Sequence, residues 1–135
     1  MTVGLLLITH GRIGAALLDA AAGVLGAQPL PAEAIAVFHD SDPEVIAADA
    51  RQRIAALGKD GGVLVLTDMY GSTPSNIACR LGEAADVVVV TGVNLPMLVR
   101  VMNYPRLSLA QLATKAVSGG SDGVFQCHRS ELVKS

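Results

Sequence analysis

Two polar residues suited to acid–base or nucleophilic chemistry each follow a short apolar run. His10 directly follows the run at residues 3–9, and Asp68 directly follows the run at residues 63–67. If both runs are strands and are neighbours, the imidazole and the carboxylate meet at one edge of a sheet. A carboxylate bonded to one ring nitrogen fixes the tautomer and leaves the other nitrogen as a nucleophile. We therefore expect nucleophilic chemistry at His10, and Gly11 beside it leaves the ring open.

The loop behind Asp68 is suited to binding an anion. Its glycine and hydroxyl residues offer backbone N–H groups and side-chain donors, and Pro74 begins a helix behind them. Because a helix N-terminus attracts negative charge, the loop is a candidate phosphoryl-binding segment. The residues concerned are Gly71, Ser72 and Thr73.

Other residues behind strand-like runs are candidates for lining the site or contacting a partner. They are Gly11, Met69, Tyr70, Asn94 and Pro96. For Asn94 and Pro96 a purely structural role, at the start of a helix, is at least as well supported. We expect His39 and His128 to be solvated, and Cys79 and Cys127 to be buried thiols.

The common nucleotide and hydrolase signatures are missing. The chain has no GxxxxGK[ST] segment, no GxGxxG after a strand and no GxSxG elbow. The first strand is not followed by the acidic pair that would hold Mg²⁺. We therefore expect neither a metal nor a cofactor, and a phosphoryl group on His10 would have to be activated elsewhere.

Composition narrows the class of protein. The chain has 135 residues, which suits one domain, and 51% of them are hydrophobic. A net charge of −2 and the absence of Trp argue against a nucleic-acid surface. No apolar run approaches the roughly 20 residues that span a bilayer. The two cysteines are far apart with no CxxC, which favours a cytoplasmic protein without membrane insertion.

Strand and helix patterns alternate along the chain. The expected strands are residues 3–9, 34–38, 63–67, 86–91 and 124–127. Helices are expected between them, with starts at Asp42, at Asn94 and at the Ser108–Gln111 capping box. This order predicts a doubly wound α/β fold with a mostly parallel sheet and helices on both faces. We expect one domain over residues 1–127 and a polar tail over 128–135.

Three segments carry a family resemblance. They are residues 5–11, which end in His-Gly; residues 68–74, Asp-Met-Tyr-Gly-Ser-Thr-Pro; and residues 92–98, Gly-Val-Asn-Leu-Pro-Met-Leu. Together they resemble the IIA domain of the mannose-family sugar phosphotransferase system, and the likeness extends to about Cys127.

The resemblance implies an enzyme, a phosphotransferase that carries phosphohistidine. His10 would bear the phosphoryl group on Nε2, Asp68 would orient the ring, and Thr73 would contact the phosphoryl oxygens. Ser72 stands where the family usually has Gly or Ala, so its contact is left open. The donor would be phosphorylated HPr. The acceptor would be a IIB component, for sugar uptake by a membrane-associated complex or for regulation.

The resemblance also implies architecture and assembly. The strand order would be 2-1-3-4, with a short antiparallel strand at residues 124–127 exchanged across a homodimer. The pair Gly119–Gly120 would be the hinge for this exchange. Because no IIB domain follows, we expect a stand-alone IIA.

Three alternatives remain at this stage. The first is the phosphocarrier subunit of a dihydroxyacetone kinase, which the segments at residues 68–76 and 94–96 disfavour. The second is a receiver-like switch phosphorylated on Asp68, which the residues after the first strand disfavour. The third is a regulatory binding module whose affinity for a partner is switched by phosphorylation of His10, which the sequence cannot separate from transport.

Overall fold

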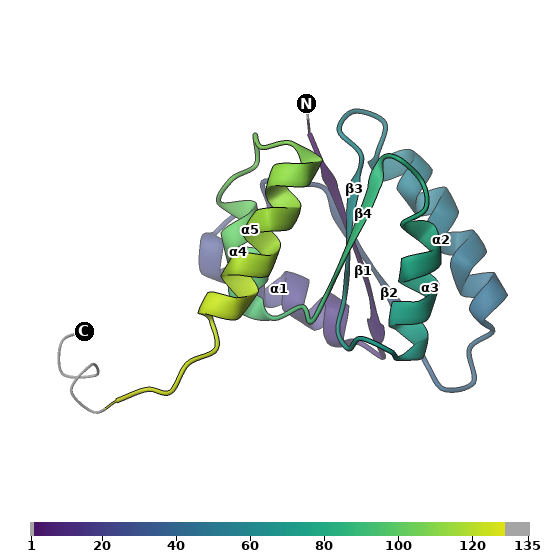
Figure 1. Ribbon diagram of the computed structural model, residues 1–135, viewed down its shortest axis with the longest axis horizontal. Helices are drawn as coiled ribbons and strands as arrows, with labels where there is room; N and C mark the ends of the chain where they lie inside the picture. The colour runs from purple at the N-terminus through teal and green to yellow at the C-terminus, as the bar shows by residue number, and fades with distance from the viewer. Residues whose placement is uncertain (1, 129–135) are drawn as a thin grey trace.

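The computed structural model describes residues 2–128 and consists of four strands and five helices in alternating order (Figure 1). The strands are β1 (Gly4–His10), β2 (Ala32–Val37), β3 (Val63–Thr67) and β4 (Val87–Thr91). The helices are α1 (Ile13–Leu25), α2 (Pro43–Leu57), α3 (Thr73–Leu81), α4 (Leu95–Met102) and α5 (Leu109–Asp122).

All four strands are parallel, in the order β2-β1-β3-β4. This confirms the expected order 2-1-3-4. The two central strands, β1 and β3, pair with Ile8 opposite Thr67. Their carboxyl ends therefore lie side by side, at the point where the strand order reverses. In open parallel sheets this is where ligands bind.

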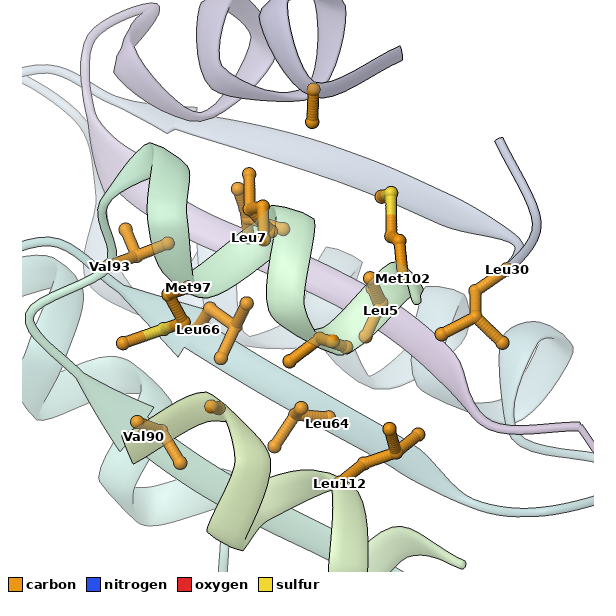
Figure 2. Close-up of a cluster of buried hydrophobic side chains, with 14 of the residues drawn as sticks. Leu5, Leu7, Leu30, Leu64, Leu66, Val90, Val93, Met97, Met102 and Leu112 are labelled. Carbon is orange, nitrogen blue, oxygen red and sulfur yellow. The ribbon is translucent and has the colours of Figure 1, made fainter. Parts of the chain in front are cut away.

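The helices form two layers that cover the two faces of the sheet (Figure 1). Helices α1, α4 and α5 cover one face, where Leu5, Leu7, Leu64 and Leu66 point into a cluster with Met97 (Figure 2). Helices α2 and α3 cover the other face. Because β1 and β3 are buried on both sides, their sequences are almost unbroken apolar runs, as is usual for parallel strands.

The predicted helix starts are confirmed. The Asp42 carboxylate accepts a hydrogen bond from the N–H of Glu44 ahead of α2. Ser108 and Gln111 form the complete capping box of α5. These side chains satisfy backbone N–H groups that the first helical turn leaves unpaired.

Several predicted boundaries are wrong. Strand β2 begins at Ala32, and α3 begins at Thr73, inside the predicted loop. Helix α5 continues through the predicted hinge: Gly119 and Gly120 are buried helical residues. A Cβ on Gly119 would lie 2.5 Å from the Cβ of Arg100 in α4. This pair of glycines is therefore a close helix contact and not a hinge.

Residues 124–128 form no strand within the single chain, and they extend away from the sheet (Figure 1). The exchange of this segment across a dimer stays a prediction. Most of the predicted polar tail, residues 129–135, lies outside the described residues.

Within residues 2–128, no helix is both long and apolar enough to cross a membrane. Cys79 and Cys127 are both exposed, so the prediction of buried thiols is wrong.

Candidate active site

His10 and Asp68 are in direct contact at the carboxyl ends of β1 and β3. The His10 ring Nδ1 lies 2.9 Å from Asp68 Oδ2, and the same oxygen accepts the backbone N–H of His10 at 3.1 Å. An ionised carboxylate only accepts hydrogen bonds, so Nδ1 carries the proton and Nε2 keeps its lone pair. The Asp68 side chain is 12% exposed and that of His10 is 45% exposed. The imidazole is therefore held at one nitrogen and open to solvent.

The pairing of β1 with β3 and the alternation along each strand explain this contact. Leu6 and Ile8 of β1 pack in the cluster under α2 and α3, so His10, two residues further on, points to the same side. Thr9 faces the other side, where its hydroxyl accepts the N–H of Gly14 at the start of α1. The position of His10 along β1 therefore determines which side of the sheet it faces.

A cavity of about 460 Å³ opens beside the His10 ring. It lies between the end of β2 and the first turns of α2 and α3. The helix starts contribute Pro43, Thr73 and Pro74 to its wall, and the segment after β2 contributes Phe38, His39 and Ser41. The first turns of two helices therefore border the cavity that His10 lines, and the dipole at a helix N-terminus favours a negative charge.

The loop from Asp68 to Thr73 turns tightly around the site. Gly71 has a φ of +83°, a conformation that favours glycine. The Ser72 hydroxyl donates to the backbone oxygen of Met69 at 2.6 Å. Thr73, in contrast, lies in the wall of the cavity beside His10. The two adjacent hydroxyls thus differ: one stabilises the loop and the other faces the cavity.

The side chains of Met69 and Tyr70 are largely exposed, as are those of Ile13 and Phe38 near the same edge of the sheet. Gly11 has a φ of +50°, and a Cβ there would lie 3.9 Å from the Phe38 ring. Exposed large apolar side chains next to a reactive group are typical of a surface that contacts another protein.

Asn94 and Pro96 lie elsewhere. The Asn94 carbonyl oxygen accepts the N–H of Met97, and its amide donates to the backbone oxygen of Gly120 in α5. Pro96 packs against Gly123 at the end of the same helix. Both residues connect α4 to α5, and neither lines the cavity next to His10.

Sequence reasoning overlooked three residues near this site. His39 is exposed as predicted, yet it lines the same cavity as His10. Its position behind a parallel strand was the available signal, since such strand ends converge. Thr67 and Ser75 are buried hydroxyl residues whose side chains find no hydrogen-bond partner within residues 2–128. No sequence pattern distinguishes them from ordinary strand and helix residues.

The described residues offer no metal centre: among them, no three His, Cys, Asp or Glu side chains come together in a way that could hold an ion. The chemistry that this geometry supports is nucleophilic attack by Nε2 on an electrophile placed at the helix N-termini.

Comparison with known proteins assigns the family. The family model EIIA-man, described as PTS system fructose IIA component, matches residues 4–117. The chain belongs to this family. It is 32% identical over 127 residues to the PTS system mannose-specific EIIAB component of Escherichia coli strain K12, across 92% of the chain. It is therefore a phosphotransferase-system IIA component of the mannose type, as the resemblance implied.

Solved structures agree with this fold. The mannose/sorbose-specific IIA subunit from Enterococcus faecalis superposes with a TM-score of 0.84 at 25% identity, covering 95% of this chain and 96% of that one. An EIIA component from Streptococcus agalactiae, 21% identical, has the same fold with a TM-score of 0.78 and covers 93% of this chain and 97% of its own. The match to the E. coli protein extends over 39% of that protein's length.

Proposed function

We propose that the protein is a phosphohistidine carrier. His10 accepts a phosphoryl group from phosphorylated HPr on Nε2 and passes it to a IIB component. The observation that carries this proposal is the contact of 2.9 Å between His10 Nδ1 and Asp68 Oδ2. It leaves Nε2 as the one ring nitrogen with a free lone pair.

The transfer exchanges one phosphorus–nitrogen bond for another. The Nε2 lone pair of His10 forms the new bond to phosphorus, while the bond to the donor's imidazole nitrogen breaks and its electron pair returns to that ring. Positive charge develops on the His10 ring as the bond forms. The Asp68 carboxylate, hydrogen-bonded to Nδ1–H, stabilises this charge. Because the bonds broken and formed are of one kind, the step runs readily in both directions.

Negative charge on the transferred oxygens needs donors of its own. The N-terminus of α3 supplies backbone N–H groups beside the cavity, and Thr73 adds a hydroxyl in the cavity wall. The start of α2 at Pro43 borders the same space. These groups are fixed by the fold before the phosphoryl group arrives, which is the condition for electrostatic stabilisation to lower a barrier.

Both partners of the reaction are proteins, and the site is accessible to them. His10 lies at the surface, and the exposed side chains of Ile13, Phe38, Met69 and Tyr70 offer apolar contacts around it. A donor and an acceptor that use the same exposed nitrogen must bind in turn. A surface with a few large apolar groups suits such transient contacts.

The test is incubation with enzyme I, HPr and phosphoenolpyruvate, followed by mass spectrometry. The wild-type protein should gain one phosphoryl group, and His10→Ala should gain none while keeping its fold. His39→Ala is the matched control: it removes the other histidine of the same cavity and keeps the proposed acceptor, so this variant should still gain one phosphoryl group. A phosphoramidate is labile in acid and stable in alkali. A phosphorylated His10→Ala protein would contradict the proposal, and a product labile in alkali would point to Asp68.

A further inference from the structure

Three buried oxygen atoms behind the His10–Asp68 pair have no hydrogen-bond partner among the described residues. They are the Thr67 hydroxyl, the Ser75 hydroxyl and Oδ1 of Asp68, the carboxylate oxygen that does not contact His10. Thr67 is 0% exposed and Ser75 is 1% exposed. Leaving a buried polar atom unpaired is unfavourable, so a group of three needs an explanation.

Strand and helix directions place the Thr67 and Ser75 hydroxyls on one side of the sheet. Along β3, Val63 and Val65 pack in the cluster under α2 and α3, so Thr67 faces that side too. Ala78 of α3 belongs to the same cluster, and Ser75 lies one turn nearer the start of this helix. Since α3 runs back from the end of β3, its first turn lies over the carboxyl end of that strand. His10 points to this side as well.

We propose that Thr67 and Ser75 are positioning residues for Asp68, acting through one buried water molecule that they share with Asp68 Oδ1. Buried waters characteristically bond to two to four polar groups that the protein leaves unpaired. Three such groups belong to Thr67, Asp68 and Ser75, at the end of β3 and the start of α3. The water donates to Oδ1 and to one hydroxyl, and accepts from the other. All three oxygens are thereby satisfied.

This arrangement would act on catalysis through orientation, and it rests on the proposed role of His10 as the phosphoryl acceptor. Asp68 uses a single oxygen for both of its contacts with His10. A carboxylate held at one oxygen is free to swing, and holding Oδ1 fixes the plane in which Oδ2 meets Nδ1–H. Loss of the anchor should loosen the bond to the ring without removing either partner, in the way that supporting groups tune metal-bound histidines.

The test uses substitutions that remove a hydroxyl and keep the shape of the side chain. Thr67→Val and Ser75→Ala should each speed up the exchange of the His10 Nδ1 proton with solvent by about tenfold, measured by NMR on histidine labelled with ¹⁵N. In phosphoryl transfer, the same variants should lower kcat and leave the KM for phosphorylated HPr unchanged. Thr67→Ser keeps the hydroxyl and should restore slow exchange.

Thr91→Val is the matched control. Thr91 is the cross-strand neighbour of Thr67 on β4, one strand further from His10, and its loss should leave the exchange rate unchanged. A high-resolution crystal structure should show one water within hydrogen-bond distance of the three oxygens. The absence of that water would overturn the proposal. So would a protein with both Thr67→Val and Ser75→Ala whose His10 Nδ1 proton exchanges as slowly as in the wild type. Neither measurement requires phosphoryl transfer, so failure of the proposed function would be seen separately.

Discussion

At the scale of single residues, the chemistry depends on which ring nitrogen of His10 is free. The sequence placed His10 and Asp68 behind two apolar runs, and the pairing of β1 with β3 brings them into contact. One carboxylate oxygen holds both the ring and the backbone of the same histidine. The ring is therefore oriented by a carboxylate oxygen that is also bonded to the backbone at the end of β1.

Asp68→Asn tests the charge of this neighbour. The amide has the same shape, and its oxygen can still accept a hydrogen bond from Nδ1–H, but it carries no negative charge. The stabilisation of the developing imidazolium is lost, so the rate of transfer from phosphorylated HPr should fall on the order of 10²-fold or more. Single-turnover transfer, followed by rapid quench, measures this. A rate within about threefold of wild type would show that Asp68 serves only as a structural partner of the strand end.

A second prediction concerns the neighbouring hydroxyls of Ser72 and Thr73. Thr73 lies in the cavity wall, whereas Ser72 donates to the Met69 backbone oxygen. We expect Thr73→Val to slow transfer by about tenfold to a hundredfold, because a donor to the phosphoryl oxygens is removed. Ser72→Ala should change the rate far less. The same single-turnover assay measures the transfer rates of both variants. The reverse order of effects would show that Ser72 is the phosphoryl contact.

At the scale of elements, the packing of α5 on α4 depends on glycine. A Cβ at Gly119 would meet the Arg100 Cβ at 2.5 Å, and one at Gly120 would meet Met97 Cε at 2.9 Å. The two helices therefore approach more closely than alanine would allow. This close approach also lets the Asn94 amide reach the Gly120 backbone oxygen.

Gly119→Ala should therefore destabilise the protein although alanine favours helices. The clash involves the base of a side chain and cannot be relieved by rotation, so we expect a loss of about 1–3 kcal/mol. Gly23 of α1 is the control, since nothing lies within 4 Å of a Cβ added there. Gly23→Ala should stabilise the protein by about 0.5–1 kcal/mol. Urea unfolding of both variants gives the comparison, and equal stabilisation by both would refute the close contact.

These glycines illustrate what the sequence could predict and what it could not. The alternation of apolar runs and helical stripes was enough to predict the parallel sheet. Capping residues such as Asp42 were enough to predict where helices start. A glycine pair, however, is equally consistent with a helix end, a hinge or a tight contact. Only the position of Arg100 on another helix decides between these. Thr67 and Ser75 were missed for the same reason, because their burial depends on elements distant in sequence.

At the scale of the whole molecule, the sheet has two edges, β2 and β4, and the His10–Asp68 pair lies at the ends of the two central strands. Strand β4 is one edge, and the apolar side chains of Val88, Val89 and Val117 line a groove between it and α5. The segment after α5 leaves this groove uncovered, and its Val124 and Phe125 side chains are 74% and 71% exposed. Unpaired apolar edges are usually covered in native proteins. Each copy of the chain has both an uncovered β4 edge and an exposed apolar segment, so two copies can cover each other's edges.

We therefore predict a homodimer in which residues 124–127 of each copy pair with β4 of the other. Removing residues 124–135 should give a monomer or an aggregating chain, because the β4 edge loses its partner strand. The cut belongs after Gly123, since Gly119 and Gly120 are buried in α5 and their loss would damage the core. Val124→Lys combined with Phe125→Lys is the milder test, because it keeps the chain length and removes the apolar side chains that the exchange would bury. Light scattering should show a dimer for the full chain and a monomer for the doubly substituted one. A full-length protein that stays monomeric at micromolar concentration would contradict the prediction.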